Sequence, residues 1–439
     1  MPDPTLGPSG RPVTASWSDT LRLLRDVIGP TIAKSIFARR YRVVGLAARV
    51  RLDRRAVERM ARLRERYGPG PLLLPVPGAT QAVLLSHDQV LPVLRAAPEP
   101  WMPASDEKRA ALAHFEPDVS LASRGMDRTR RRALNDRALE WDRPVHSRAA
   151  RVAAIMAEEM PRDATLDWDT FHAAWSRAVR RIVLGDGAAD DQELTAMLLK
   201  LRQAGNWAMF RPYRRGLMER FHARLADHIE RAEPGALVSA LPISPDGGLP
   251  GGEVPDQVTH WLFAFDPGGM ATFRALALLA AHGTGDVRDD VEGDDPPGPR
   301  SPLRVTMLES LRLWPTTPAI LREAARDLED GTVQQGTNLT IFAPYHHRAP
   351  GQPAADHFEP ALWSGEGDDP ATAHAARGLV PFSAGPAACP ARHLVPMVGA
   401  LGLRALLRGR EVEAVESPLR AGEPLPATLD NSALSFRFR

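Results

Sequence analysis

The only cysteine of the chain, Cys389, lies in a turn-rich stretch, LVPFSAGPAACPARHLVP, at residues 379–396. One cysteine cannot form an internal disulfide, and a lone cysteine is most often a small core residue. Here Pro390 follows it, and an apolar run follows the proline. Because proline favours the first position of a helix, we expect Cys389 at a helix N-cap. The N–H groups at a helix start favour an anion, so they favour the thiolate, the form that ligates metals.

A second unusual feature is the helix-like stretch at residues 255–282, which would extend roughly 42 Å as one helix. Its middle is Pro267-Gly268-Gly269, which costs roughly 5 kcal/mol relative to alanine. Such breakers predict a local bulge or the close approach of a flat ligand. Thr272 can hydrogen-bond back to a carbonyl group beside them. The alternative is two helices joined by a turn at the breakers.

Two pairs of charged residues have helical spacing. Glu309 and Arg312, at i and i+3 before Pro315, are by themselves an ordinary ion pair worth a few tenths of a kcal/mol. Arg128 and Arg132, at i and i+4, repel each other. They form either a solvated basic face or a site for an anionic ligand, since the guanidinium fork suits carboxylates.

The composition is that of a water-soluble globular protein. The 439 residues are 44% hydrophobic and 25% charged, with a net charge of +1, which gives no reason to expect a nucleic-acid partner. A single cysteine fits a reducing cytoplasm rather than a disulfide-built secreted fold. The N-terminus lacks the pattern of a signal peptide, and no uncharged apolar run reaches about 18 residues. We therefore expect a cytoplasmic protein without a membrane anchor.

Periodicity predicts a mainly α fold with small β-sheets, an α+β architecture. Residues 1–16 are rich in Pro, Gly and Ser and are predicted to be disordered. Gly/Pro turns bracket two short apolar runs at 67–86, which predicts a strand pair. Residues 128–313 are mostly helical, and short strands follow near 331–345. No convincing boundary divides residues 17–439, so we expect one catalytic domain.

Together these stretches resemble the haem-thiolate monooxygenases of the cytochrome P-450 superfamily, in its soluble bacterial type. Phe382, Gly385 and Cys389 match the family's loop of an aromatic residue, two residues, Gly, three residues and Cys. Glu309 and Arg312 match its Glu-x-x-Arg motif. The order and spacing of the motifs fit from about residue 67 to the C-terminus.

The resemblance implies a single-body cytochrome P-450 fold, with haem b (iron protoporphyrin IX) between a long distal helix and a proximal Cys loop. Cys389 would be the iron ligand, a thiolate that promotes O–O cleavage. Phe382 and Gly385 would shape the loop around it. The haem propionates would be held by three arginines: Arg128, Arg132 and Arg322. The structural network behind the loop would comprise Glu309, Arg312 and His357.

On the distal side, the resemblance assigns catalytic roles to two residues of the broken helix. Thr272 matches the family's threonine that helps deliver protons during dioxygen activation, and Gly269 would make room for dioxygen. Candidate substrate-pocket residues are Ala264, Pro267, Gly268, Thr317 and Ala319. Two positions depart from the family pattern. Ala271 stands where an acid is usual, and Ala387 stands where His or Arg normally contacts a propionate.

The implied activity is that of a monooxygenase, which would oxidise, for example hydroxylate, a small and mostly apolar metabolite of the kind found in secondary metabolism. It would use O2 and electrons from a ferredoxin or flavodoxin and its reductase, with the redox partner docking near Arg392. Two alternatives stay open because of Ala271 and Ala387. One is a peroxide-driven or atypical oxidation, such as coupling or ring closure; the other is a non-catalytic haem-binding sensor.

Overall fold

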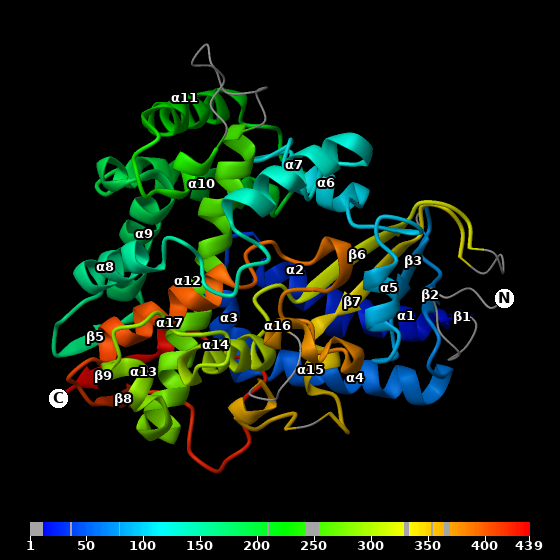
Figure 1. Cartoon of the computed structure of the whole chain (residues 1–439). Coiled ribbons are helices and arrows are strands. Elements are labelled where there is room, and N and C mark those ends of the chain that lie inside the picture. Colours follow the sequence, from blue (N-terminus) through cyan, green and yellow to red (C-terminus); the bar gives the residue numbers. More distant parts are fainter. Residues whose placement is uncertain are drawn as a thin grey trace. The chain divides into compact units, whose positions relative to one another are not determined.

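The structure is a computed structural model that describes residues 12–35, 37–78, 80–208, 210–241, 254–328, 333–352, 354–363 and 369–439. The chain forms two compact units, each assembled from segments that are far apart in the sequence (Figure 1). Unit 1 comprises Met1–Asp106, Leu308–Cys389 and Pro418–Asp430, and unit 2 comprises Glu107–Met307, Pro390–Ser417 and Asn431–Arg439. The mainly helical fold with small sheets is as predicted. That residues 17–439 act as one domain stays a prediction.

Unit 1 contains a six-stranded sheet with the strand order β1-β2-β3-β7-β6-β4. Its strands are β1 (Val13–Thr14), β2 (Leu72–Leu74), β3 (Gln81–Val83), β4 (Trp101–Met102), β6 (Ala319–Ala324) and β7 (Asn338–Phe342). The strand pair predicted at 67–86 is confirmed, since β2 and β3 pair antiparallel. Strand β7 then runs parallel to β3 and antiparallel to β6.

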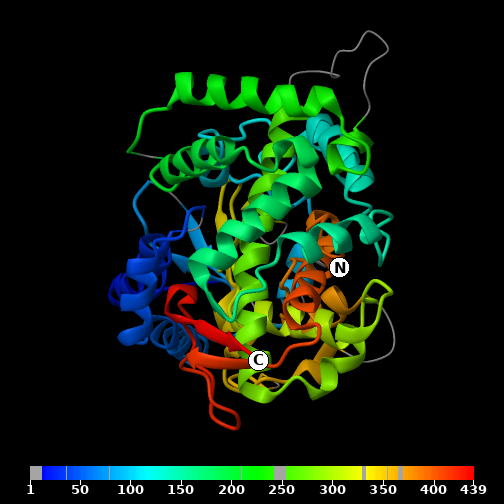
Figure 2. The ribbon, with the colours of Figure 1, turned by 90° about the vertical axis from the view of Figure 1, so that its left-hand side faces the viewer.

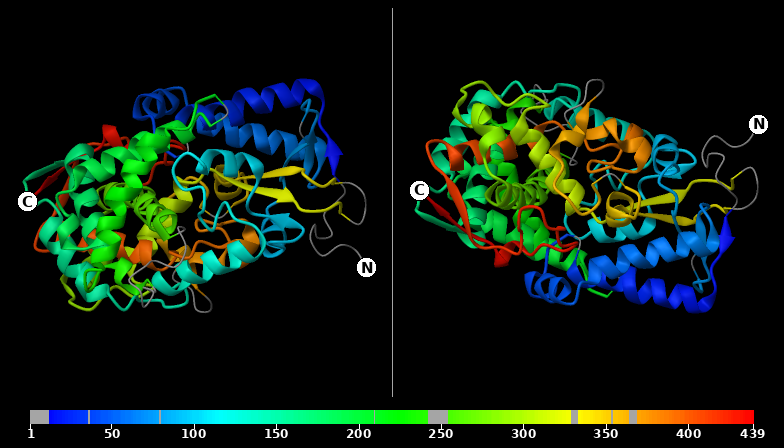
Figure 3. Two further views of the ribbon diagram at one scale, coloured as in Figure 1. Left: turned by 90° about the horizontal axis from the view of Figure 1, so that it is seen from above. Right: turned by 90° about the horizontal axis from the view of Figure 1, so that it is seen from below.

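Both faces of this sheet are covered, as alternating side chains require. The helices of unit 1 are α1 (Trp17–Leu23), η1 (Leu24–Ile28), α2 (Gly29–Lys34), α3 (Tyr41–Arg49), α4 (Leu52–Tyr67), α5 (Val90–Arg95), α15 (Ala343–Arg348), η5 (Pro360–Trp363), α16 (Pro370–Ala373), η6 (Ala375–Arg377) and η7 (Gly385–Ala387). Val83 and Leu85 belong to a core cluster with α1, η1 and α4. Ala82 and Leu84 belong to a cluster with α5. The N-terminal helices (blue) and the strands β6 and β7 (yellow) can be followed in Figure 3.

The predicted disorder of residues 1–16 is wrong for the part that lies within the described residues. Val13 and Thr14 form β1, parallel to β2. The side chain of Ser16 caps α1 by accepting from the backbone N–H of Asp19. Pairing with a sheet edge and a helix cap therefore order a segment whose composition alone suggested none.

Unit 2 is mostly helical (Figure 2). Its helices are α6 (Asp106–Leu112, whose first residue belongs to unit 1), α7 (Gly125–Ala138), α8 (Ala149–Glu159), α9 (Trp168–Leu184), η2 (Asp186–Ala188), α10 (Gln192–Gly205), α11 (Arg215–Arg231), η3 (Leu237–Ala240), α12 (Val254–His282), η4 (Gly285–Val287), α13 (Arg288–Glu292), α17 (Leu394–Leu407) and η8 (Asn431–Ala433). A three-stranded sheet, β5-β9-β8, comprises β5 (Thr165–Asp167), β8 (Val412–Glu416) and β9 (Ser435–Phe438). Helix α14 (Pro302–Leu313) is shared by the two units.

Helix α12 is the central helix of unit 2, with α9 and α17 packed against it. It is continuous from Val254 to His282 with Pro267 inside it, so the prediction of one long helix is confirmed and the alternative of two helices is wrong. Among the described residues it alone is long and apolar enough to cross a membrane, yet 72% of its most apolar window is buried in the protein. It is therefore built as a core helix.

The glycines that follow Pro267 serve helix packing. A Cβ atom on Gly269 would lie 2.7 Å from Nε1 of Trp175 on α9, and one on Gly268 would lie 3.0 Å from Cγ1 of Val395 on α17. The Trp175 indole also donates to the backbone carbonyl of Phe265 at 2.9 Å. The cost of two glycines in a helix thus permits a close contact with a tryptophan.

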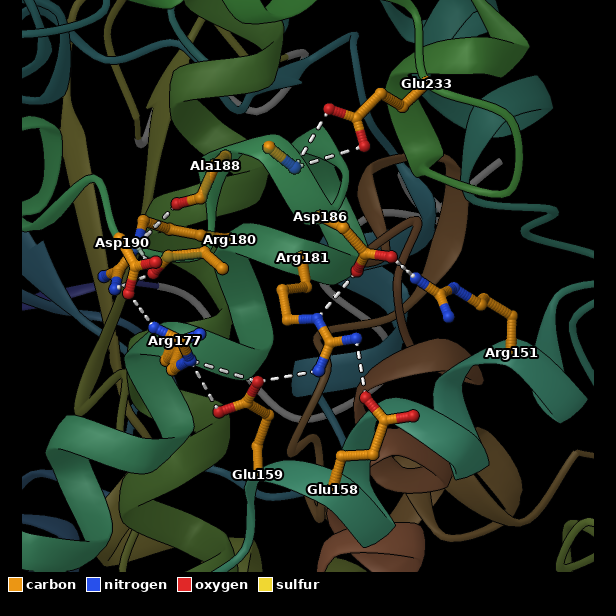
Figure 4. A network of polar contacts seen from close by, with 12 residues as sticks. Arg151, Glu158, Glu159, Arg177, Arg180, Arg181, Asp186, Ala188, Asp190 and Glu233 are labelled. Carbon is orange, nitrogen blue, oxygen red and sulfur yellow. Dashed lines mark hydrogen bonds and ion pairs between the residues drawn. The ribbon is translucent and has the colours of Figure 1, made fainter.

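Charged side chains join α8, α9 and η2 at the surface of unit 2 (Figure 4). Arg181 contacts Glu158 and Glu159 of α8, each at 2.7 Å, and Asp186 of η2 at the same distance. Arg151 of α8 contacts Asp186 as well. A network with a shared, largely buried arginine stabilises more than isolated surface pairs do, and here it fixes α8 against α9.

Candidate active site

The loop before Cys389 is held by its own backbone and by α5. The N–H of Cys389 donates to the carbonyl oxygen of Phe382 at 2.9 Å. Gly385 has φ +68°, and a Cβ there would lie 2.4 Å from the carbonyl oxygen of Leu94 on α5. Only glycine fits this close approach. Cys389 itself stays partly exposed, as a ligand to an added group must.

The predicted helix cap at Cys389 is wrong. Helix α17 begins at Leu394 with His393 as its N-cap, and residues 390–393 form a turn. Pro390 is the first residue of this turn and not of the helix. Helix-dipole effects fade within the first turn. The loop backbone, rather than a helix start, therefore positions the sulfur.

Glu309 and Arg312 form a fully buried ion pair on α14, with both side chains 0% exposed. Nε of Arg312 donates to Oε2 at 2.7 Å, and Nη2 donates to Oε1 at 2.6 Å. The carboxylate also accepts from the Glu359 backbone N–H at 2.8 Å and from the Trp363 indole at 2.9 Å. A buried ion pair needs such extra bonds to offset the loss of hydration. The surface pair considered from the sequence is thus a buried anchor.

The guanidinium of Arg312 also binds the loop that precedes Glu359. It donates to the carbonyl oxygens of Ala354 at 3.1 Å and His357 at 2.7 Å. The structure therefore places His357 at the network, but through its backbone and not its ring. Because any residue could supply that carbonyl, the identity of the side chain at position 357 is a weak indicator of a place in the network.

His347 links this network to the start of the Cys loop. Its Nδ1 donates to the carbonyl oxygen of Arg312 at 3.1 Å, and its Nε2 accepts from the N–H of Val380 at 3.0 Å. This arrangement requires the neutral ring, because a proton on Nε2 would face the Val380 N–H. Burial lowers the pKa of His347 to about 3. Sequence reasoning missed this residue.

Arg322 lies on β6, 2% exposed, and faces the same loop. Its Nη2 donates to Oγ of Ser383 at 3.3 Å, so one guanidinium touches the segment between Phe382 and Gly385. Of the two pocket candidates nearby in the sequence, Thr317 is exposed and Ala319 is partly exposed on β6. Unit 1 thus brings together Cys389, its loop and one buried arginine.

In unit 2, Arg128 and Arg132 lie on one face of α7, and both are partly buried. Arg128 donates to the carbonyl oxygen of Ser120 at 3.0 Å, whereas Arg132 donates to Asp136 at 2.6 Å. Burial lowers the pKa of Arg128, and the charge of Arg132 lowers it further.

Thr272 has neighbours that differ from those its predicted role needs. It is 0% exposed, and its hydroxyl donates to the carbonyl oxygen of Gly268 at 2.9 Å. A methyl group on Gly399 of α17 would lie 2.8 Å from this hydroxyl. The predicted back-bond to a carbonyl is confirmed. It holds the hydroxyl in the contact between α12 and α17.

Asp266, the acid next to Pro267, pairs with two basic side chains. Arg202 of α10 binds it at 2.6 Å and His172 of α9 at 3.0 Å. Burial opposes ionisation of Asp266, but these partners outweigh it and hold its pKa well below the usual range. Asp266 is therefore a fixed carboxylate and an unsuitable proton donor.

A second buried acid, Glu116, was missed by the sequence reasoning. It is 0% exposed, and its Oε1 binds Nδ1 of His260 on α12 at 2.8 Å. Burial raises the pKa of Glu116. Burial also opposes the charge of His260, but the Glu116 carboxylate outweighs it and raises the pKa of His260. The only signal in the sequence was the place of His260 four residues before Ala264.

A stripe of partly exposed side chains runs along α12 at helical spacing: His260, Phe263, Ala264 and Pro267. After Pro267 every residue from Gly268 to Leu279 is buried, Gly269 and Thr272 among them. Of the pocket candidates, Ala264 and Pro267 thus lie on the stripe, and Gly268 lies in packing. The sequence thus predicted two of the partly exposed residues, Ala264 and Pro267, together with one packed residue, Gly268.

The residues of unit 1 suit a haem with one iron ligand and an anionic propionate. Unit 1 offers a partly exposed thiol in a fixed loop and the buried cation of Arg322. A soft thiolate suits iron, and guanidinium groups suit carboxylates.

Comparison with known proteins finds one matching family model and several similar folds. The family model for cytochrome P450 matches residues 303–422. Cytochrome P450 CYP102L1 has a similar fold, with a TM-score of 0.65 at 19% identity over 88% of this chain and 94% of that chain. CYP175A1 from Thermus thermophilus has a TM-score of 0.64 at 18% identity, over 88% and 96%. A search of curated protein sequences gave no match.

The state of His347 predicts acid sensitivity. Its pKa is about 3 in the fold and about 6.5 in an unfolded chain, so the unfolded state takes up a proton first. Its contribution is complete above about pH 6.5, and each pH unit below that removes about 1.4 kcal/mol until about pH 3. In denaturant unfolding between pH 7 and 5, His347→Gln should have a shallower pH dependence than the parent.

Burial also lowers the pKa of His87 and His346, so some acid sensitivity should survive in that variant. As the control, His357→Gln changes an exposed ring and should keep the pH dependence of the parent. Identical slopes for His347→Gln and the parent would contradict the assignment of a neutral, buried His347.

Proposed function

From its membership of the cytochrome P450 superfamily, which the family model over residues 303–422 and the fold support, we propose that this chain is a monooxygenase of a small, mostly apolar molecule. The family binds haem b through a cysteine thiolate. A haem iron with this ligand supplies dioxygen activation and O–O bond cleavage.

Cys389 is assigned as the iron ligand because the chain has one cysteine. This is the single observation that carries the proposal, and the loop geometry supports it. The bond from the Cys389 N–H to Phe382 and the close contact of Gly385 with α5 keep the sulfur in one place. A rigid loop reduces the entropy cost of binding a metal.

The haem propionates are assigned to Arg322 and to Arg128 with Arg132. The buried charge of Arg128 and the position of Arg322 against Ser383 support this assignment. With these arginines in place, haem binding does not require a basic side chain at position 387, where this chain has Ala387. Glu309 and Arg312 act as structural residues.

The reaction uses O2 and electrons from a ferredoxin or flavodoxin with its reductase. Arg392 is partly exposed and lies over the Trp141 ring at 4.6 Å, and such a cation suits the acidic surface of an electron carrier. The substrate lies along the partly exposed stripe of α12. A cytoplasmic location fits the single cysteine.

The first test is optical. Reduced protein under carbon monoxide should have the strongly red-shifted Soret band of a thiolate-ligated haem, and Cys389→Ser should lose it because a serine oxygen is a much weaker donor to iron. Ala387→Ser places a hydroxyl in the same loop without removing the sulfur and should keep the band. A parent protein without the band, loaded with haem, would contradict the proposal.

A second candidate function is peroxide-driven oxidation. It is favoured by the state of α12, where Ala271 precedes Thr272, the Thr272 hydroxyl is bound to Gly268, and Asp266 is paired with Arg202. The two acids of that helix, Asp256 and Asp266, are both in ion pairs. Neither acid of that helix is therefore free to deliver a proton to dioxygen.

The two functions differ in their oxidant. If the redox-partner route operates, product formation with NAD(P)H, ferredoxin and reductase should exceed that with hydrogen peroxide. The comparison uses one substrate found by a spectral-shift screen. Turnover with peroxide alone, at a higher rate than with the reductase, would replace the monooxygenase proposal by the second candidate.

A further inference from the structure

We propose that Glu116 and His260 form a binding site for a hydroxyl group at one end of an otherwise apolar substrate. The inference rests on the proposed function, because it concerns the substrate of that same enzyme. It identifies Glu116 as a specificity-determining residue.

The first argument is an unused acceptor. Glu116 is fully buried, and its Oε1 is bound by His260. Within the described part of the chain, its Oε2 has no hydrogen-bond partner. A buried polar atom without a partner costs about 1–3 kcal/mol. A ligand that donates a hydrogen bond to Oε2 would recover that cost.

The second argument is the charge balance around Glu116, which favours a neutral donor. Each of the three carboxylates in this region has a basic partner. Glu116 has His260, Asp256 has His222 at 3.1 Å, and Asp266 has Arg202. Asp256 also accepts from the Asp118 backbone N–H at 2.6 Å. An ammonium or a carboxylate on the ligand would upset this balance, whereas a hydroxyl would not.

The third argument is the aromatic surface beside the pair. The Phe263 ring lies edge-on to His260, with centroids 5.8 Å apart, and edge-on to Phe115 at 5.7 Å. The Arg202 guanidinium lies 4.6 Å from the centroid of the Phe263 ring. These contacts fix the ring in place. Ala264 is the next residue of the stripe after Phe263, and its side chain is a single methyl group.

The helix geometry then sets a length for the substrate. From His260 to Pro267 is seven residues, or roughly 10 Å along α12. A hydroxyl at Glu116 and an apolar body along Phe263 and Ala264 therefore place the far end of the molecule near the Pro267 break. The class that fits is a long-chain or similarly extended apolar alcohol.

The test compares two probes on the haem-loaded protein: 1-octanol, whose extended length matches this distance, and its methyl ether, which has the same chain but no donor. Binding is measured by isothermal titration calorimetry and by the shift of the Soret band. The alcohol should bind about tenfold more tightly than the ether. This comparison needs no variant, so a misfolded mutant cannot decide the outcome.

Glu116→Gln then tests the residue. The amide can still accept from His260 through its oxygen, but it presents an N–H where Oε2 was. The oxygen of either probe can accept from that N–H, so the preference for the alcohol should fall to about one. Glu219→Gln, on the exposed face of α11, is the matched control and should keep the tenfold preference.

Equal affinity for the two probes in the parent, or failure to bind either, would overturn the inference, as would a preference that survives in Glu116→Gln. These outcomes are separable from failure of the proposed function. A protein that has the thiolate band under carbon monoxide but no preference for the alcohol retains the function and loses only the inference.

Discussion

The buried ion pair between Glu309 and Arg312 is the interaction on which the cysteine-bearing unit depends. Removing two charges from water is expensive, and their attraction offsets this only when further hydrogen bonds satisfy the remaining atoms. Here those bonds come from Trp363, the Glu359 N–H and the carbonyl groups of the preceding loop. The pair thereby holds irregular chain that has little hydrophobic core of its own. Through His347 it also reaches Val380, where the Cys loop begins.

The second organising constraint is the change in α12 at Pro267, before which several side chains are partly exposed and after which the helix is buried as far as Leu279. Its glycines and Thr272 pack against α9 and α17, so the breakers serve close helix contacts. The partly exposed stripe combines apolar surface with the Glu116–His260 pair. Acids near the break are neutralised by neighbouring bases. In the proposed function, this helix therefore binds and orients the substrate.

Features defined by local spacing were predictable from the sequence. The Glu309–Arg312 pair, the long helix and the cysteine loop each occupy one short segment with a recognisable pattern. Features made by tertiary contact were not. The turn at 390–393 displaced the predicted helix cap, and the contact between Gly269 and Trp175 could be seen only once α9 and α12 were placed together. Glu116 and His260 are 144 residues apart in the chain, so no local pattern joins them.

The central claim is that the Glu309–Arg312 network holds the Cys loop in the form that ligates iron. It is tested most directly by Glu309→Gln, which keeps the shape of the side chain but leaves Arg312 as a buried, uncompensated charge. The account predicts a loss of about 3–5 kcal/mol in the free energy of unfolding, together with loss of the thiolate band under carbon monoxide. A variant with the full band and the stability of the parent would contradict it.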